Sequence, residues 1–441
     1  MANISDIDPD GDGLVDVVPR MAEIRRDSPS RPFLAAPGTY RCGSPLPVLG
    51  EAPLSIYGVG SNGAGPATYD YKHSVLFVPS FAEGDLFAVS TPFPCWFENF
   101  RIEPEPQYRP GVGAGIHVRG TPAATNANTV FRNVAVVAKD IGIRQVQATG
   151  HLLEHCYFEG WRSAGILNET SSQHEGNPGW YTHNRFFGNA GNPAAIADRG
   201  PCLLTETGYA RISENLIVGG RVGIHVAIKN RPGGAPLISG NWIEDQWEYG
   251  ILVESLDGQP CSMLAIEANE LSVIEARPSF TASICLRERT DGRWLKQFAI
   301  RANTIRNNLS NSNGKFIWVQ AGLGGKIHDN SLNNLSAGPR MGVQLTGSAT
   351  NDALAPPIEA TGNQFLSESG RGFTYLYSVA DGIARIEHKQ GVTVADLTAK
   401  ITSPADGSEV YVLDGKARST PISGGGTGTL ARRVDGAWVG T

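Results

Sequence analysis

The stretch ISENLI (212–217) recurs with small changes as ISGNWI (238–243), IEANEL (266–271), IRANTI (300–305) and IHDNSL (327–332). In each copy an apolar residue is followed by two spacers, Asn, one spacer and a second apolar residue. Related segments extend the series: FENFRI with Asn99, FRNVAV with Asn133, LEHCYF (153–158), YTHNRF with Asn184 and IEATGNQF with Asn363. These positions lie about 29 residues apart on average, and a fixed period of this length predicts a repeat architecture.

A second motif lies between the asparagines. It reads GIHV (115–118), GIRQV (142–146), GIHV (223–226), GILVE (250–254), SICLRE (283–288), FIWVQ (316–320) and GVQL (342–345). Each period therefore carries at least two short alternating strands and a polar turn residue, which can bury their apolar faces only by stacking coil on coil. Asn tolerates left-handed backbone and can pair its amide with the next Asn. The pattern predicts a parallel β-helix; leucine-rich and hexapeptide repeats fit the period and composition less well.

The composition agrees with this fold. Glycine accounts for 53 of the 441 residues and charged residues for only 18%, which disfavours long helices. The net charge is −6 without a long basic run, and no apolar stretch approaches about 18 residues, so we expect neither nucleic-acid binding nor a membrane span. The N-terminus lacks a signal-peptide pattern. The six cysteines show no CxxC spacing and are expected to be reduced core residues.

Several segments resemble a known family. FLAAPGTYRC (33–42) resembles the entry strand of the pectate-lyase-like right-handed β-helix superfamily, and LSIYGVGSNG (54–63) and SVLFVPSFAEGDLFAV (74–89) resemble its next coils. Val17, Val18, Met21 and Ile24 have the helical spacing of the capping helix in such proteins. Residues 408–441 resemble the small β unit that ends many bacteriophage tailspikes and tail fibres.

The resemblance implies an all-β, three-sheet solenoid of about ten to twelve coils. We expect an N-terminal segment and capping helix at 1–32, the right-handed parallel β-helix at 33–380 and a C-terminal β unit at 381–441. Because an open solenoid end exposes apolar surface, trimerisation through the C-terminal unit is expected; a simple monomeric cap is the alternative.

Alternation in the second motif sends every other side chain outward. His225, Glu254, Arg287 and Trp318 are expected to form one column on successive coils, and Arg199 another outward position. In the pectate-lyase-like family the sheet before the longest turn generally lines the saccharide groove. The turn at 227–235 and the turn with Asp245, Trp247 and Glu248 would then flank it. Glu154 and His183 are discounted, since they are expected on another face.

Glycoside hydrolysis needs two carboxylates, which Glu254, Glu248 and Asp245 could supply. His225, Arg287, Trp318, Trp247 and Arg199 are the predicted substrate-binding residues. Each also has a structural interpretation, as a solvated strand or turn acid, a surface histidine or a tryptophan packed under a loop.

The segment DPDGDGLVD (8–16) resembles the first half of a calcium loop, with Asp8, Asp10, Asp12 and Asp16 at ligand positions. The bidentate Glu is missing, and Pro19 stands in its place. We therefore expect no required cofactor and a solvated acidic turn, with weak Ca²⁺ binding as the alternative.

These features together predict a phage or prophage tailspike-like homotrimer that binds a bacterial surface polysaccharide, either capsule or O-antigen. Cleavage is expected by hydrolysis rather than by β-elimination. Other phage tail or baseplate proteins are the expected partners, and the expected location is the virion tail after synthesis in the host cytoplasm, or else extracellular. A non-enzymatic adhesin or structural spike and a secreted bacterial polysaccharide lyase are the alternatives.

Overall fold

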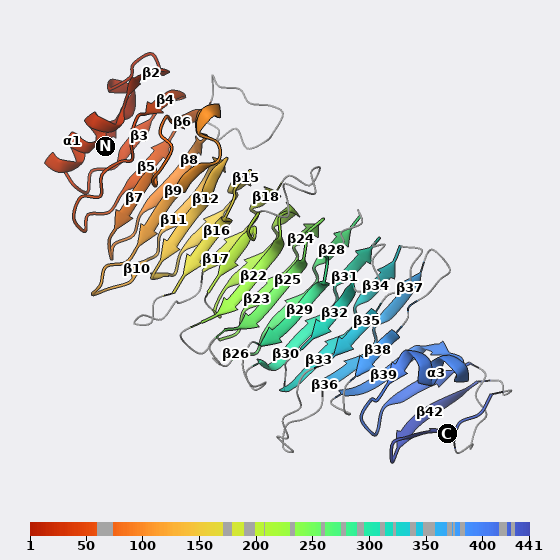
Figure 1. Ribbon diagram of the computed structural model, residues 1–441. Helices are drawn as coiled ribbons and strands as arrows, with labels where there is room; N and C mark the ends of the chain where they lie inside the picture. Colours follow the sequence, from red (N-terminus) through yellow and green to blue (C-terminus); the bar gives the residue numbers. More distant parts are fainter. Residues whose placement is uncertain are drawn as a thin grey trace. The chain divides into compact units, whose positions relative to one another are not determined.

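The computed structural model describes residues 1–59, 74–170, 179–188, 199–206, 208–229, 234–256, 261–274, 279–288, 295–308, 314–320, 323–335, 341–346, 358–367, 373, 375–379, 384–413, 421–424 and 428–441. The chain forms two compact units, Met1–Val226 and Ala227–Thr441. Within each unit the strands stack in parallel, coil on coil (Figure 1).

The first unit contains the predicted helix. α1 (Val18–Asp27) buries Val18, Met21, Ala22 and Arg25, while Ile24 is only half-buried. The Arg25 guanidinium donates to the carbonyls of Pro47 and Ala52, at 3.2 and 3.3 Å, so the helix is fixed by polar as well as apolar contacts. The first strands of the unit are β1 (Ala2–Asn3), β2 (Asp12–Asp16), β3 (Phe33–Ala35), β4 (Gly38–Cys42), β5 (Ser55–Gly58) and β6 (Val75–Pro79).

Each later coil contributes three strands, which we call leading, following and third strands. A two-residue corner separates the leading strand from the following strand. In β8 (Trp96–Ile102) and β11 (Val130–Val137) one strand runs through the corner. The leading strands are then β14 (Leu152–Glu154), β17 (Trp180–Thr182) and β20 (Arg211–Ser213), and the following strands are β15 (Tyr157–Glu159), β18 (Arg185–Gly188) and β21 (Leu216–Gly219). The third strands are β7 (Phe87–Ser90), β9 (Gly111–Arg119), β12 (Lys139–Val146), β16 (Ala164–Glu169), β19 (Leu203–Thr205) and β22 (Val222–Ile228).

The second motif forms the third strands, as predicted. Ile143 aligns with Ile116 and Ile166 on neighbouring strands, and all three are fully buried. Gly142 precedes Ile143 because a side chain there would overlap the Gly165 carbonyl oxygen and the Phe158 ring. The core of the coil thus explains why the motif begins with Gly.

The second unit repeats this organisation. Its leading strands are β23 (Leu237–Ser239), β27 (Ala265–Glu267), β30 (Leu295–Arg301), β33 (Leu323–His328), β36 (Ile358–Thr361) and β39 (Ala384–Val392). Its following strands are β24 (Trp242–Glu244), β28 (Glu270–Val273), β31 (Thr304–Asn307), β34 (Ser331–Asn334) and β37 (Gln364–Ser367). Its third strands are β25 (Tyr249–Ser255), β29 (Ala282–Glu288), β32 (Lys315–Val319), β35 (Met341–Leu345), β38 (Tyr375–Val379) and β40 (Ile401–Thr402).

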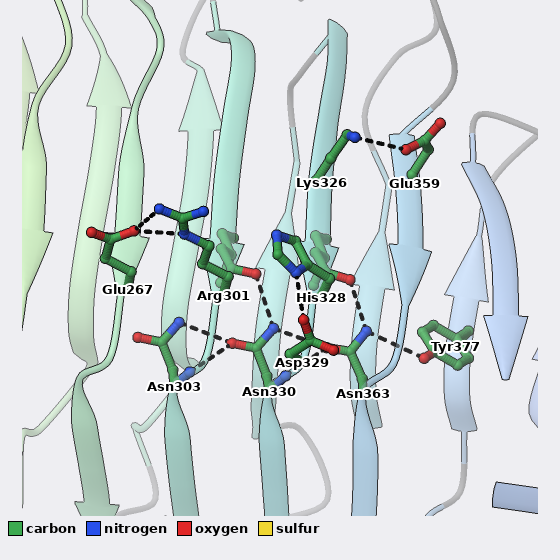
Figure 2. Close-up of polar contacts among 12 residues, drawn as sticks. Glu267, Arg301, Asn303, Lys326, His328, Asp329, Asn330, Glu359, Asn363 and Tyr377 are labelled. Carbon is green, nitrogen blue, oxygen red and sulfur yellow. Dashed lines mark hydrogen bonds and ion pairs between the residues drawn. The ribbon is translucent and has the colours of Figure 1, made fainter. Parts of the chain in front are cut away.

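The repeated asparagines form a buried amide row. In the second unit the side-chain amide of Asn303 donates to the Oδ1 of Asn330 at 2.9 Å, and Asn330 donates likewise to Asn363. Figure 2 shows this row ending at the Tyr377 hydroxyl, which accepts from Asn363 at 3.3 Å. Every amide also donates to a backbone carbonyl, as Asn303 does to Ile266. Buried polar groups satisfied in this way hold the corner together.

The corner has two distinct positions, which the sequence pattern merges. The buried position holds the amide row, with Asn184 and Asn215 in the first unit. The residue just before it has left-handed backbone and an outward side chain, as in His183 and Glu214, both with φ of 56°. Asn99 and Asn133 occupy this left-handed position, since the register aligns Arg132 with both Glu98 and Glu154. Assigning these two asparagines to the same row as Asn184 is therefore wrong.

The parallel stacking continues past the predicted boundary at 380. β39 pairs in parallel with β36, and β40 pairs in parallel with β38. β41 (Glu409–Val412) still pairs in parallel with β39, and only β42 (Thr429–Val434) and β43 (Ala437–Gly440) add antiparallel strands. α3 (Val394–Lys400), capped by the Thr393 hydroxyl, lies beside β38 and β40 (Figure 1).

All six cysteines are free and buried, as predicted. Burial raises the pKa of Cys95 to about 11 and that of Cys156 to about 12, so these thiols remain protonated and behave as small apolar side chains. Among the described residues, no helix reaches the length and apolar character that spanning a membrane requires.

Candidate functional site

The strand register divides the predicted column of outward side chains. His225 lies on β22, and Glu254, Arg287 and Trp318 lie on β25, β29 and β32. In the second unit Glu254 aligns with Arg287, whereas Trp318 aligns with Cys285. Arg287 lies two residues farther along β29 than Cys285, so Trp318 and Arg287 stand in different rows. The single column predicted from the sequence is therefore wrong.

Glu254 is buried in an ion pair. Its side chain is 1% exposed, and its Oε2 accepts from the Arg287 Nε at 2.6 Å. The Arg287 Nη1 also lies 3.4 Å from the Tyr249 hydroxyl oxygen. Burial opposes the charge of Arg287, but the hydrogen bond and charge of Glu254 outweigh it and raise the Arg287 pKa. A buried carboxylate held in this way is poorly placed to exchange a proton with a substrate.

In the turn after β24, Asp245 has a structural role. Asp245 has left-handed backbone, with φ of 58°, and is nearly buried. Its Oδ1 accepts from the backbone amide of Ile274 at 2.8 Å, which ties it to the next coil. Trp247 and Glu248 are half-buried. The other predicted turn, at 227–235, lies partly outside the described residues.

The remaining predicted binding residues occupy separate places. Trp318 is half-buried, with the Lys315 ammonium 4.3 Å from its ring centroid and its indole N–H donating to the Thr346 hydroxyl. Arg199 donates to the Trp161 carbonyl oxygen. Leu204, rather than Arg199, aligns with His225 in the register. The predicted catalytic and binding roles of the eight residues stay predictions.

The acidic N-terminal segment also serves the backbone. The Asp12 Oδ1 accepts from the Leu14 amide at 2.9 Å, and the Asp16 Oδ1 accepts from the amides of Val18 and Gly43. Asp8 is 2% exposed, so the expectation of a wholly solvated turn is wrong for this residue. In the described ranges no three His, Cys, Asp or Glu side chains are arranged to hold a metal ion. Calcium binding stays a prediction.

A groove lies on the outer side of the corner in the first unit. Its volume is about 530 Å³. It is lined by Asn133, His155, Cys156, Tyr157, His183, Asn184, Arg185, Glu214 and Leu216. The left-handed corner residues supply its central side chains, because left-handed backbone turns the strand while leaving the side chain in solvent. The sequence prediction had discounted His183, which lies in this groove.

Two imidazoles and a carboxylate follow one another along this groove. The rings of His155 and His183 lie 5.0 Å apart, centroid to centroid, at an interplanar angle of 32°. The His183 Nε2 lies 2.5 Å from the Glu214 Oε2, and its Nδ1 lies 2.9 Å from the Thr182 hydroxyl oxygen. Arg185 is exposed at the rim just beyond the corner. The groove therefore offers several donors and one carboxylate acceptor.

An apolar and aromatic row lies on the leading strands of the same unit. Trp96, Val130, Leu152 and Trp180 align in register on four adjacent strands. Trp96 is 37% exposed and Trp180 is 40% exposed. At about 4.8 Å per strand the two indoles are about 14 Å apart. Arg211 continues the row beyond Trp180.

The next outward row carries matched charges. Arg132 lies between Glu98 and Glu154, with its Nη1 3.7 Å from the Glu98 Oε1 and its Nε donating to Glu154. Both carboxylates therefore share one guanidinium. Flat aromatic faces beside hydrogen-bonding groups are the arrangement that binds sugar rings and their hydroxyls. The glutamates at 98 and 154 are held by Arg132.

The comparisons with known proteins support the fold assignment. The chain is similar to the A-module of the mannuronan C-5 epimerase AlgE4 of Azotobacter vinelandii, with a TM-score of 0.55, 11% identity, and coverage of 87% of this chain and 99% of the other. It is similar to the Dettilon tailspike protein, with a TM-score of 0.55, 14% identity and coverage of 96% and 74%. The third is a tailspike protein of the Escherichia coli bacteriophage HK620 in complex with a pentasaccharide, with a TM-score of 0.51, 11% identity and coverage of 93% and 80%.

These similarities confirm the predicted fold, a right-handed parallel β-helix. No family model matches the sequence, and no curated protein matches it. At these identities the similarity concerns the fold alone.

Proposed function

We propose that this chain is a tailspike-like protein that binds a bacterial surface polysaccharide along the outer face of its first unit. The observation that carries the proposal is the row of Trp96 and Trp180, exposed on the leading strands of the unit whose corner forms the polar groove. Sugar rings stack on such indoles, while the groove side chains can hydrogen-bond the hydroxyls. The complex of the HK620 tailspike with a pentasaccharide shows that this fold can bind a glycan.

Glycan binding can be tested by removing the two indoles. The variant Trp96→Ala/Trp180→Ala should lose about tenfold or more in affinity for the bound polysaccharide, since each aromatic contact contributes about 0.5–1.5 kcal/mol beyond its buried area. Trp242→Ala is the matched control, because Trp242 is a similarly exposed indole on β24 of the second unit. Equal effects of the double variant and of the control on binding would refute this placement of the site.

Cleavage of the glycan by hydrolysis is the second part of the proposal. Glu254, Glu248 and Asp245 are the proposed carboxylates, and the catalytic unit of an α-1,3-glucanase from Streptomyces thermodiastaticus has a similar fold, with a TM-score of 0.52, 13% identity and coverage of 86% of this chain and 68% of that one. The assay is incubation with capsule and O-antigen preparations, followed by measurement of new reducing ends. Ultraviolet-absorbing unsaturated products would instead identify a lyase.

The structure favours binding over catalysis, because Glu254 and Asp245 are engaged with Arg287 and with the Ile274 amide. Retention of glycan binding without any released product would therefore identify a non-enzymatic adhesin or structural spike, the second candidate function.

We further propose assembly as a homotrimer in a phage tail through residues 381–441. The antiparallel strands at this end leave Tyr411, Leu413 and Leu430 exposed at 40%, 53% and 39%, and Tyr411 and Leu430 pair across β41 and β42. Light scattering should give three times the mass of one chain. A monomer would count against the tailspike assignment and in favour of a secreted enzyme.

A further inference from the structure

We propose that the corner groove of the first unit recognises an anionic sugar residue, with Arg185 pairing with its carboxylate. This inference rests on the proposed function and narrows it, because it assigns the polysaccharide to the acidic class. The proposed site is the groove between the leading and following strands. It is separate from the third-strand residues that the sequence predicts as binding residues.

In the part of the chain that the structure describes, the carboxylates near the groove are paired with groups other than Arg185. Arg132 is matched by Glu98 and Glu154. Glu214, the carboxylate among the groove-lining side chains, lies against His183. Within the described ranges of the chain Arg185 has no ion-pair partner, although it is exposed. A guanidinium that no described carboxylate neutralises, in a groove of a protein with net charge −6, is a local attractor for anions.

The position of Arg185 is well defined by its surroundings. It directly follows Asn184, a fully buried member of the amide row, and its backbone amide donates to the Cys156 carbonyl at 2.8 Å. Its register neighbours on the following strands are Tyr157 and Leu216, which also line the groove. The base of the arginine is thus fixed, which lowers the entropic cost of aligning its guanidinium with a ligand. A guanidinium presents two parallel N–H donors that match the two oxygens of a carboxylate.

The two histidines provide the remaining contacts of such a sugar. His155 and His183 are both exposed and project from the corner beside Arg185. The His155 ring nitrogens can bond a hydroxyl next to the carboxylate. His183, which is held by Glu214 and the Thr182 hydroxyl, keeps its ring beside that of His155 at an interplanar angle of 32°. Trp180, three residues before His183, provides a platform for the neighbouring sugar of the chain.

The direct test compares acidic glycans with their carboxyl-reduced forms, which keep the sugar backbone and lose the charge. The probes are oligogalacturonate, oligomannuronate and hyaluronan oligomers, each in both forms, with binding measured by calorimetry at fixed pH and low salt. At least one acidic form should bind about tenfold or more tightly than its reduced form, and added salt should weaken that binding. Equal affinity for acidic and reduced forms would overturn the inference.

The variants locate the effect. Arg185→Gln should lower affinity for the acidic form about tenfold, and Arg185→Lys should recover part of it, because lysine keeps the charge without the two-donor geometry. Arg301→Gln is the matched control: it removes the same charge from an exposed arginine of the second unit, which pairs with Glu267 at 2.6 Å (Figure 2). If Arg185→Gln weakens binding no more than Arg301→Gln does, the inference is wrong.

The histidine variants can be made without disturbing the corner. Asn occupies the same left-handed position at Asn99 and Asn133, with φ of 61° and 50°. His155→Asn and His183→Asn should therefore fold normally and lower affinity for the acidic form several-fold. A panel of neutral glycans distinguishes failure of acidic specificity from failure of the proposed glycan binding. Binding of neutral glycans alone would leave the proposed function intact and refute acidic specificity, whereas no binding to any glycan would refute both.

Discussion

The buried amide row makes a sharp prediction about Asn303, which lies near its middle. Its Oδ1 accepts from the backbone amide and the side-chain amide of Asn269. Its Nδ2 donates to the Ile266 carbonyl and to the Asn330 Oδ1. The substitution Asn303→Ala removes these four hydrogen bonds and leaves the bond from its own backbone amide to Asn330 in place.

The expected loss of stability follows from this inventory. Each buried hydrogen bond contributes about 1 kcal/mol net, so the four together give a loss of about 4 kcal/mol in the free energy of unfolding. Asn308→Ala is the control, because the exposed Asn308 makes one side-chain bond, to the Ile274 carbonyl. Its loss should be no more than about 0.5 kcal/mol.

Urea unfolding followed by circular dichroism measures both variants. Hydrogen exchange adds a local reading, because the Asn269 amide loses its acceptor in Asn303→Ala while the Asn241 amide keeps its bond to Asn269. Exchange should accelerate at Asn269 first. A loss below about 1 kcal/mol, or unchanged exchange at Asn269, would refute the view that the amide row holds the corners together.

Three further predictions concern single sites. Glu254→Gln should destabilise the protein by about 1–3 kcal/mol, because it leaves the Arg287 charge half-buried and unmatched. In urea unfolding, the double variant Glu254→Gln/Arg287→Met should recover part of this stability. An unchanged midpoint in the single variant would contradict a stabilising ion pair. Burial lowers the pKa of His151 to about 3, so the unfolded chain binds the extra proton, and stability should fall as the pH drops below about 6.5 towards 3. In His151→Gln the stability difference between pH 7 and pH 5 should shrink by about 2 kcal/mol, and an identical pH profile would argue against a buried neutral imidazole. Gly142→Ala should lower the free energy of unfolding by about 3 kcal/mol or more, because the new methyl group overlaps the Phe158 ring. In the control Gly50→Ala the methyl group meets no atom within 4 Å, so thermal unfolding should change mainly through the left-handed backbone of Gly50. Similar losses of stability in the two variants would contradict the role of packing at Gly142.

The fold could be predicted because it depends on periodicity. The recurrence of Asn with its flanking apolar residues fixes the coil length, and the glycine-led motif fixes a third strand. The two positions of the corner are harder to predict, because the sequence patterns of their rows differ by only one spacer residue. FENFRI has one spacer between its first apolar residue and Asn99, whereas ISENLI has two before Asn215. Because FENFRI has one spacer fewer, Asn99 takes the left-handed position. The number of spacers before Asn therefore distinguishes the left-handed row from the buried row.

The candidate site was harder still, since it depends on contacts between coils. His155, His183 and Glu214 are about 30 residues apart in sequence, and only the strand register brings them into one groove. Their signal in the sequence is a polar residue directly before the buried position of successive coils. The burial of Glu254 could not be predicted from alternation, because all of β25 is buried on both faces, and alternation alone cannot say which outward face is covered.

The left-handed corner residue closes the coil through its backbone, whereas its side chain determines the chemistry of the surface. Among the described corners the position holds Asn99, His155, Glu214, Gly240, Ala302 and Asp329, all with positive φ. The backbone closes the coil whatever the side chain, and the cost of a new residue is about 1–2 kcal/mol of conformational preference. Side chains of the corner row can therefore be exchanged without altering the core. A protein of this fold can acquire a new binding specificity through substitutions at one coil after another.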